Sequence, residues 1–548
     1  MLMQSIRRNV RLSCSAAAGA AALALAATTA SAAHYYVAPG GTGDYTAGNP
    51  GGSPVAAAQK ATAAGDVIHL ATGLYEFENG DIMVADGVTL VGGGATPEET
   101  VVSRIVAAPD GSTNARMIHL GRNAVMRNLT SRGGYTAYQA AGVLGYSATA
   151  GVHKQFTVSN CVVENASALY KGGGSMGGMW IDCVIRNCEV RNASGASLYE
   201  GSGGGIWGGT LHGCVVTNNT AAYLGGGIAG NDADRCEAHD CLIAFNKAPY
   251  GAGAGVSSSY APESCRIVGC TLEGNDAQLA TGQTWGGWGG AAFNCFTTNS
   301  LIAHNNSIGY GGGTYGGRNV DCRISGNRGS VGGGTMEGVS IGCTICTNTA
   351  YSGQGGACYN SSTYNCLVSR NTSQEDAVLF RGYHQGNVIF DNISLSGYRG
   401  SAIASVDNST MDVAAVNCTI VGNTGTGARA QVFLAAVTNS IVVGGTGSSF
   451  EADILYGDAV HSLFGSRSGG YDAVKCIAGV DPKFAKVGPT VFDYYTPLVG
   501  SPCRDAGVHI GWMDGAKDIA GNQRIKYGAV DIGALEYCGG LAFIVVVK

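Results

Sequence analysis

The chain has 548 residues, of which 89 are glycine and only 11 are proline, and its formal net charge is −6. Glycine is far above its usual share of about 7%, so internal repeats have to be sought before any globular domain is assumed. The acidic balance argues against nucleic acid or an anionic membrane surface as a partner.

Residues 1–32 have the features of an export signal. Arg7, Arg8 and Arg11 precede an uncharged stretch rich in Ala and Leu, and Ala30-Ser31-Ala32 supplies the small residues of a cleavage site. No later stretch approaches the roughly 20 apolar residues that a membrane-spanning helix needs. We therefore expect an exported protein that is extracellular or held on the outer surface of a bacterium.

The segments after this signal read YYVAPGGTGDYTAG, AAGDVIHLATGLYEF and GVTLVGGG. They resemble the opening of pectin-lyase-like right-handed β-helix proteins, in which such a segment caps and starts the solenoid. The resemblance implies that residues 33–124 form an N-terminal cap and the first coils. It implies no particular activity, because proteins with this solenoid include lyases, hydrolases and adhesins.

Residues 125–466 repeat one short motif. Each copy begins with a small anchor residue, and successive anchors lie 21 to 31 residues apart: Cys214, Cys241, Cys270, Ser300, Cys322, Cys343, Cys366, Asn387 and Cys418. An aliphatic residue follows two positions later in every copy. An asparagine follows five positions later in every copy: Asn219, Asn246, Asn275, Asn305, Asn327, Asn348, Asn371, Asn392 and Asn423.

This repeat predicts stacked strands. The period-2 spacing of anchor and aliphatic residue is typical of a strand, and the glycine runs between copies exclude helices. We predict an all-β, single-stranded right-handed parallel β-helix solenoid of roughly 12–15 coils, about 4.8 Å apart, with N- and C-terminal caps. Each asparagine is expected to take left-handed backbone angles at a bend and to donate its amide to the asparagine one coil along.

Cysteine is unusually frequent and falls into two columns. The anchor cysteines are expected to face the narrow core as small apolar residues. A second column lies five residues before the anchors, with Cys188 counted as the anchor of an earlier and less regular copy, and it contains Cys183, Cys236, Cys265 and Cys295. Residues stacked in register about 4.8 Å apart lie slightly beyond the Cβ separation of about 3.5–4.5 Å that a disulfide prefers, so most of these cysteines are expected to be buried thiols.

Residues 467–548 are expected to form a C-terminal cap or anchor region. SPCRDAG at 501–507, DIAGNQR at 518–524 and DIGALEY at 531–537 resemble the C-terminal signature of bacterial choice-of-anchor Q β-helix surface proteins. The central Asn and Gly-Gly pattern is also similar to the repeats of chlamydial polymorphic outer membrane proteins. Both resemblances imply a location at the cell surface rather than an activity.

A candidate ligand surface comes from the residues seven positions before successive anchors: Ile181, Trp207, Asp234, Glu263, Phe293, Tyr315, Met336, Tyr359 and Phe380. If the preceding residue in each coil points inward, this column points outward. Trp207, Phe293, Tyr315 and Tyr359 would then form an aromatic file able to stack on sugar rings.

Two carboxylates interrupt this column on neighbouring coils. Asp234 and Glu263 are expected about 5 Å apart, a spacing that suits a retaining glycosidase pair or, with Asp232, a calcium site. Arg235 could neutralise the carboxylate of a uronate. The alternatives are that both acids are solvated surface residues, or that the strand phase is inverted and the aromatic rings lie in the core.

The sequence therefore favours an exported surface or secreted β-helix that binds glycans or other surface polymers, in the manner of an adhesin, without a demonstrable catalytic constellation. No cofactor is required, and calcium is the one ion that the acidic residues could hold. The alternative is a polysaccharide lyase or glycoside hydrolase that acts on an acidic polysaccharide through the lateral face of the β-helix.

Overall fold

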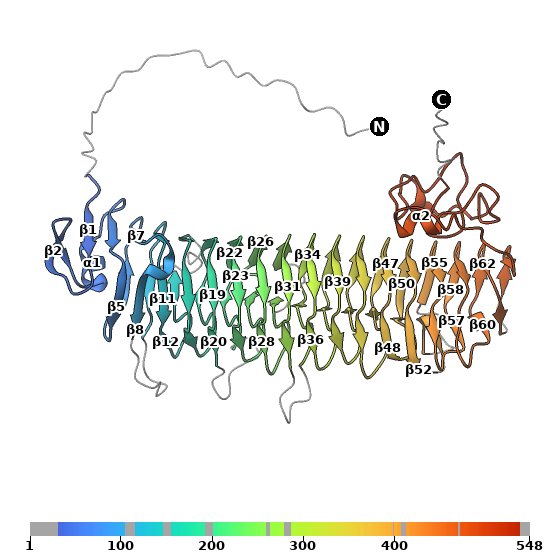
Figure 1. Ribbon diagram of the computed structural model, residues 1–548, viewed down its shortest axis with the longest axis horizontal. Helices are drawn as coiled ribbons and strands as arrows, with labels where there is room; N and C mark the ends of the chain where they lie inside the picture. The colour runs from blue at the N-terminus through green and yellow to red at the C-terminus, as the bar shows by residue number, and fades with distance from the viewer. Residues whose placement is uncertain are drawn as a thin grey trace, which may run out of the picture.

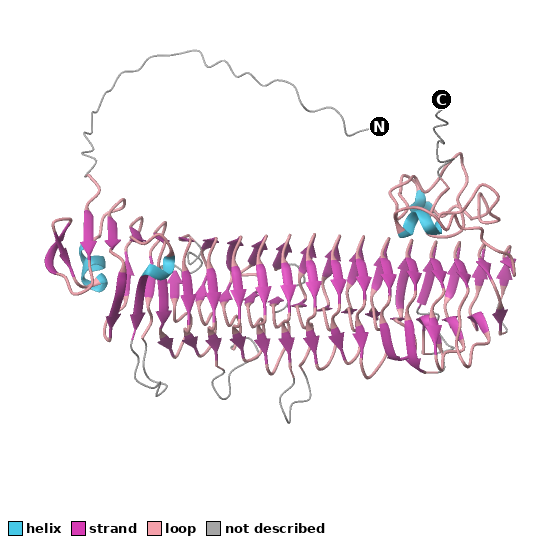
Figure 2. Ribbon diagram, in the orientation of Figure 1, coloured by secondary structure: helices cyan, strands magenta, loops and turns pink. Residues whose placement is uncertain are grey.

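A computed structural model describes residues 31–104, 115–145, 155–191, 201–258, 264–278, 286–397, 399–406, 413–469 and 472–537. Almost all regular structure in these residues is β-strand, and the two α-helices lie near the two ends (Figure 2). The export signal predicted at residues 1–32 falls almost wholly outside the described residues. Among the described residues, no helix is long and apolar enough to cross a membrane.

The chain winds into a long solenoid of parallel coils (Figure 1). One coil shows the pattern: β22 (Gly209–His212), β23 (Val215–Thr217), β24 (Thr220–Ala221) and β25 (Ile228–Gly230) follow one another around the axis. We call the four stacks to which these strands belong face 1, face 2, face 3 and face 4. Each strand pairs in parallel with its equivalents one coil before and one coil after.

Within the described residues, the four faces differ in length. Face 1 runs from β4 (Val67–Leu70) to β64 (Ala473–Val474), and face 2 stacks 17 strands from β5 (Gly73–Phe77) to β65 (Ile477–Ala478). Face 3 stacks 12 short strands from β12 (Tyr135–Thr136) to β56 (Thr424–Gly425), and face 4 stacks 16 from β6 (Ile82–Val84) to β63 (Arg467–Ser468). The predicted right-handed parallel β-helix is confirmed, and the strands beyond the expected 12–15 coils belong to terminal coils that lack the motif.

The N-terminal end is closed by a short structure packed on the first coil. β1 (His34–Val37) pairs in parallel with β4, and β2 (Thr42–Thr46) pairs in antiparallel fashion with β3 (Asn49–Gly51). Helix α1 (Pro54–Lys60) starts after Ser53, whose hydroxyl accepts the Ala56 N–H at 3.2 Å. Its alanines join the apolar cluster that continues into the solenoid core.

The asparagines form a ladder inside the corner between faces 2 and 3. All nine are buried, and Asn219 is representative: its backbone N–H and its Nδ2 both donate to Asn246 Oδ1, at 3.0 and 3.1 Å. Nδ2 also donates to the Ile185 carbonyl at 3.0 Å. Beyond Asn423 the ladder continues through Gln431, whose Oε1 accepts both donors of Asn423 at 3.1 Å.

The expectation that the ladder asparagines take left-handed angles is wrong. The left-handed residue is the one before each asparagine: Asn218, Phe245, Gly274, His304, Gly326, Thr347, Arg370, Asp391 and Gly422. A left-handed residue turns the chain at the corner, and the following side chain then points inward. The bend and the ladder are therefore made by adjacent residues rather than by one.

The anchor cysteines are buried at the corner between faces 1 and 2, and one column assignment needs correction. Cys183 pairs in register with Cys161 and Cys214, so it is an anchor and not a member of the second column. Cys188 occupies the ladder position before Asn219, and its N–H donates to Asn219 Oδ1 at 2.9 Å. Cys183 and Cys188 are five residues apart, which is the spacing between an anchor and its ladder asparagine in the regular copies. In this coil a cysteine replaces the asparagine, so the sequence pattern does not show which of the two is the anchor.

Most described cysteines are buried thiols, as expected, but one pair is not. Cys236 and Cys265 stack in register at the start of adjacent face 1 strands and form a disulfide. Burial raises the pKa of the Cys295, Cys358 and Cys418 thiols to about 12, which keeps them protonated and unreactive.

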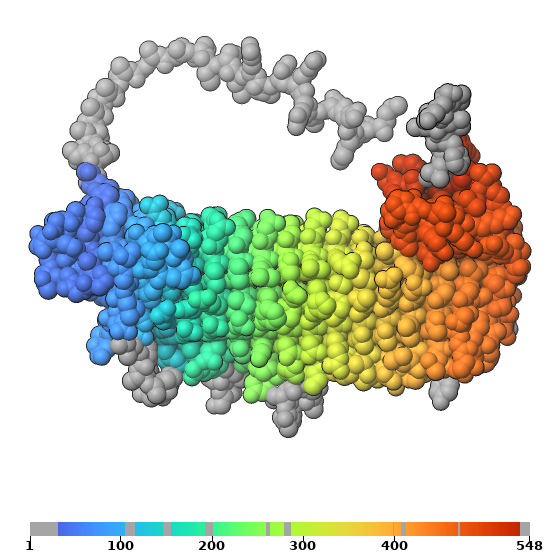
Figure 3. Space-filling model, viewed as in Figure 1, coloured from blue at the N-terminus to red at the C-terminus, as the bar shows by residue number. Residues whose placement is uncertain are grey.

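Residues 479–537 fold back along the flank of the solenoid (Figures 1 and 3). This segment contains α2 (Val491–Tyr495), which begins with a capping box between Thr490 and Asp493. It covers outward residues of face 2, where Val388, Ile441 and Leu463 pack with Phe484 and Leu535. Of the region expected as a C-terminal cap, residues 479–537 lie on a lateral face of the last coils, whereas β63 (Arg467–Ser468), β64 (Ala473–Val474) and β65 (Ile477–Ala478) still belong to the solenoid.

Candidate functional site

The predicted outward column exists on face 4, but without the two carboxylates. The residues in register in this column are Trp207, Phe293, Tyr315, Met336, Tyr359 and Phe380. The two coils between Trp207 and Phe293 contribute Ala229 and Ser257. Asp234 lies instead in a turn between β25 and β26 (Cys236–His239). This turn adds residues 231–235 to the coil, so counting back from the anchor reaches the turn rather than face 4. Ile181 ends the face 1 strand β18 (Met179–Ile181) for a different reason: it lies seven residues before Cys188, which holds a ladder position, whereas the residue seven positions before the anchor Cys183 is Met176.

The predicted carboxylate pair is therefore not a pair within one strand column. Asp234 Oδ2 accepts the indole N–H of Trp207 at 3.1 Å, and Asp232 and Arg235 are exposed in the same turn. Glu263 lies outside the described residues. Across the described ranges, no group of three or more His, Cys, Asp or Glu side chains could hold a metal ion, and calcium binding at Asp232, Asp234 and Glu263 stays a prediction.

The aromatic column points outward, away from the core, but its rings face one another. Ile206 and Ala292, which precede Trp207 and Phe293, belong to the core cluster. Trp207 is itself fully buried against Met176 and Ala229, with the Lys171 ammonium 4.2 Å from its ring centroid.

Phe293, Tyr315 and Tyr359 are half-buried. The rings of Phe293 and Tyr315 stack at 5.4 Å with planes 17° apart, and Tyr359 stacks in the same way on Phe380. The ring faces are thus largely taken up by neighbouring coils.

A groove on face 3 went unnoticed in the sequence. It has a volume of about 470 Å³ and crosses β20 (Glu189–Val190), β24 and the coil of β28 (Lys247–Ala248). Its lining consists of Glu189, Val190, Arg191, Thr220, Ala222, Tyr223, Pro249 and Tyr250. Tyr223 and Tyr250 each stand four residues after a ladder asparagine, and that recurrence was the available signal.

The two tyrosines of this groove do not stack in parallel. Their ring centroids are 6.1 Å apart and their planes are tilted by 47°, and Tyr250 is 39% exposed. Arg191 forms an ion pair with Glu189, whose Oε1 also accepts the Ser167 hydroxyl at 3.0 Å. The groove therefore presents tilted ring surface beside a guanidinium and a carboxylate, which is the kind of lining that fixes a polar ligand.

An ionisable patch lies on the outer side of face 1 and includes the end of the segment NDADRCEAHD at residues 231–240. The His212 and His239 rings stack at 4.8 Å, and His239 Nε2 lies 3.6 Å from Glu237 Oε2. Arg266 of β30 (Cys265–Val268) is the in-register neighbour of Glu237. The side chains of His239 and Glu237 are 31% and 43% exposed, so an imidazole beside a carboxylate is open to solvent here.

A third ionic cluster, near the N-terminus, is covered. His119 Nε2 lies 2.9 Å from Asp81 Oδ2, and Arg104 pairs with the same carboxylate. Burial alone would raise the pKa of Asp81, but the hydrogen bonds from His119 and Arg104 hold it below its usual value. The His119 side chain is only 8% exposed, so this cluster is poorly placed to meet a polymer.

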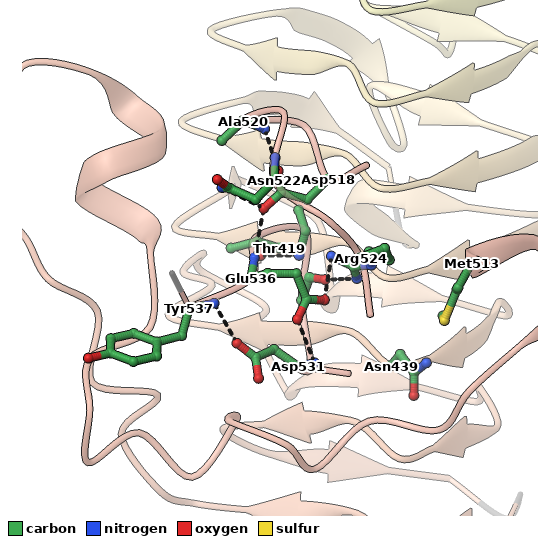
Figure 4. Close-up of polar contacts among 12 residues, drawn as sticks. Thr419, Asn439, Met513, Asp518, Ala520, Asn522, Arg524, Asp531, Glu536 and Tyr537 are labelled. Atoms are coloured by element: carbon green, nitrogen blue, oxygen red, sulfur yellow. Dashed lines mark hydrogen bonds and ion pairs between the residues drawn. The ribbon is translucent and has the colours of Figure 1, made fainter. Parts of the chain in front are cut away.

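The C-terminal motifs form a buried network that attaches residues 479–537 to the solenoid (Figure 4). Arg524 Nη1 lies 3.2 Å from Glu536 Oε1, and Arg524 also donates to the Gly533 carbonyl. Asp518 accepts the Glu536 N–H at 2.8 Å, and Asp531 accepts the Tyr537 N–H at 2.7 Å.

Two backbone groups of the same loop reach the solenoid itself. The Ala534 N–H donates to Thr419 Oγ1 at 2.9 Å, and the Gly533 N–H donates to the Asn439 carbonyl at 2.7 Å. Burial raises the pKa of Glu536, and the neighbouring Arg524 guanidinium opposes that rise. DIAGNQR and DIGALEY therefore hold an element in place and leave no open site at this cluster.

No family model matches the chain, and no curated protein matches it by sequence. Solved structures do. A pectate lyase, Pel9A, is 11% identical with a TM-score of 0.21, and the match covers 92% of this chain and 96% of that one.

Two further solved structures are similar over most of their length. A mannuronic acid specific polysaccharide family 6 lyase from human gut microbiota is 10% identical with a TM-score of 0.30, covering 80% of this chain and 86% of that one. The A-module of a mannuronan C-5 epimerase from Azotobacter vinelandii is 15% identical with a TM-score of 0.21, covering 78% and 92%. At such values the comparisons carry no argument about activity, and the resemblance to choice-of-anchor Q proteins stays a prediction.

Proposed function

We propose that this protein is an exported β-helix that binds a polysaccharide across the coils of its lateral surface, with the tyrosine groove of face 3 as the main contact. The observation that carries the proposal is the groove itself, in which Tyr223 and Tyr250 expose tilted ring surface beside Arg191 and Glu189. Aromatic surface suits the C–H faces of sugars, and the charged pair suits their hydroxyl or carboxylate groups.

The spacing of the groove also suits a chain-like ligand. Its lining comes from three successive coils, which rise by about 10 Å in two steps of 4.8 Å. That length accommodates a short run of sugar units laid across the coils. The repetitive surface beyond the groove would allow a longer polymer to continue along the solenoid, which suits an adhesin-like role.

The test is a binding measurement with immobilised polysaccharides, neutral and uronate-containing, and the chain from residue 33 onward. Tyr250→Ala and Tyr223→Ala are each expected to weaken binding at least tenfold. The control is Tyr383→Ala, because Tyr364 and Tyr383 form a similar tilted pair on face 1, at 5.9 Å and 40°. Equal binding by all three variants would remove the groove from the proposal, and no binding by the unmodified protein across the panel would end it.

A second candidate is elimination at a uronate, carried by the contact between His239 and Glu237 on the exposed face 1. His239 would take the proton beside the carboxyl group, Glu237 would orient the imidazole, and Arg266 would neutralise the substrate carboxylate. The bond to the leaving sugar oxygen then breaks, a C=C bond forms, and solvent returns a proton to that oxygen.

Such elimination produces an unsaturated uronate that absorbs in the ultraviolet. If the candidate is correct, uronate polysaccharides give rising absorbance that His239→Ala abolishes. His509→Ala is the matched control, because His509 pairs with Asp514 at 2.9 Å in the C-terminal segment. A flat trace with the unmodified protein would reject this candidate without affecting the binding proposal.

A further inference from the structure

The inside of the solenoid changes from apolar to polar over five coils. On the inner side of face 1, five successive coils each contribute one polar side chain to a single column: Thr297, Asn319, Ser340, Thr363 and His384. They belong to β34 (Phe296–Thr298), β38 (Arg318–Val320), β42 (Val339–Ile341), β46 (Ser362–Tyr364) and β50 (Gly382–Gln385). The same column is apolar earlier, with Leu211 and Ile267, and apolar again later, with Ala415 and Val437.

Face 4 is polar on its inner side at the matching level. Thr314 and Thr335 lie in register there, in β37 (Thr314–Tyr315) and β41 (Thr335–Met336). Asn319 Nδ2 donates to Thr314 Oγ1 at 3.1 Å, so the two polar columns meet across the interior. Thr, Ser, Asn and His side chains thus occupy positions that earlier coils fill with apolar residues.

Several of these groups lack a hydrogen-bond partner in the protein. Thr297 Oγ1, Ser340 Oγ and His384 Nε2 are fully buried and make no hydrogen bond within the described residues. The other ring nitrogen of His384, Nδ1, lies 2.9 Å from Thr363 Oγ1, which accepts from Asn387 Nδ2 at 2.7 Å.

We propose that the lumen from β34 to β50 is a binding site for a file of internal water molecules. Buried hydroxyl and imidazole groups are nearly always satisfied, and an internal water needs a polar pocket with two to four partners. Adjacent coils supply those partners at steps of about 4.8 Å, so each water can bridge one coil to the next or face 1 to face 4. This inference is independent of any activity on the outer surface.

The proposal is tested by whether removal of a lumen hydroxyl raises or lowers the urea midpoint of unfolding. In a hydrated lumen, Thr297→Val and Ser340→Ala each remove a partner from a bound water and lower the urea midpoint of unfolding. In a dry lumen the same changes remove an unsatisfied hydroxyl and raise the midpoint. Thr344→Val and Ser362→Ala are the matched controls, because both residues are half-buried on the outer side of nearby strands. A midpoint equal to or above that of the controls would overturn the proposal.

A crystal structure of the unmodified chain from residue 33 onward is a second test of internal water, and it does not require the variants to fold. Ordered water within hydrogen-bond distance of Thr297 Oγ1, Ser340 Oγ and His384 Nε2 is the expected result. Clear density for these side chains with none for water beside them would overturn the proposal.

Discussion

At the scale of single residues, the interior of this solenoid is held by stacked polar contacts as much as by apolar packing. From Asn246 to Asn423, each ladder asparagine has one oxygen that accepts two donors from the preceding coil and one amide that donates twice or more. Asn327, in the middle of the ladder, accepts from Asn305 N and Nδ2 at 3.0 and 2.9 Å. A buried polar group that loses its partner keeps the full cost of its desolvation, so one side chain affects two coils.

Asn327→Ala is therefore expected to lower the free energy of unfolding by about 3 kcal/mol, because the buried N–H of Asn305 loses its acceptor and two buried oxygens, of Ile302 and Asn348, lose a donor. Equilibrium unfolding in urea measures the effect. Asn306→Ala is the control, since Asn306 is half-buried on the outer side and contacts Asp276. A loss no larger than that of the control would show that the ladder is not important for stability.

His384 predicts a dependence of stability on pH. Burial lowers its pKa to about 4, below the value of about 6.5 for an unfolded histidine. The unfolded state therefore binds more protons than the folded state between these pH values. The contribution of neutral, buried His384 to the free energy of unfolding is complete above pH 6.5 and is lost as the pH falls to 4. The loss reaches about 3 kcal/mol. Urea midpoints from pH 4 to 7 should fall less steeply in His384→Gln than in the unmodified protein.

At the scale of elements, the C-terminal segment is attached by buried charges. Arg524 is 1% exposed and is the cation among the buried carboxylates Asp518, Asp531 and Glu536. Buried ion pairs add little net stability when complete, but breaking one leaves an uncompensated charge. Arg524 and the three carboxylates are therefore expected to be required for residues 479–537 to dock on face 2.

Arg524→Met should release residues 479–537 from the solenoid, at a cost of about 3–5 kcal/mol in the free energy of docking. Limited proteolysis is expected to cut within this segment and to leave the coils intact. Lys517→Met, at an exposed position beside Asp518, should resist the protease like the unmodified protein. Equal cleavage of the two variants would show that apolar contacts alone hold the segment.

At the scale of the whole molecule, each coil contacts its neighbours and little else, as in other solenoids. The C-terminal segment is the exception, because it packs along face 2 from β51 (Val388–Phe390) to β62 (Leu463–Phe464) and so links several coils. Its removal exposes Val388, Ile441 and Leu463 to water.

Deletion of residues 479–548 is therefore expected to speed amide hydrogen exchange in the strands of β51 to β65 and to leave the coils of β14 (Thr157–Ser159) to β31 (Thr271–Glu273) unchanged. The matched comparison is Arg524→Met, which should give the same pattern with a smaller increase. Faster exchange along the entire solenoid would show that the molecule unfolds as one cooperative unit.

The sequence by itself determined the features that repeat. Anchor, aliphatic residue and asparagine recur because every coil must place the same kinds of side chain at the same corners, and this was enough to predict strands, parallel stacking and the core. The outward phase of the aromatic column on face 4 could be predicted for the same reason, since strand alternation is local.

The features that do not repeat from coil to coil became visible only in the tertiary structure. The turn at residues 231–235 moved Asp234 out of its expected column, because a coil can absorb extra residues between strands without changing the spacing inside them. The groove of Tyr223 and Tyr250, the disulfide between Cys236 and Cys265, and the attachment of Arg524 and Glu536 beside Thr419 all join residues from different coils. Such contacts depend on which coils become neighbours and where each loop leaves the solenoid, and a one-dimensional pattern records neither.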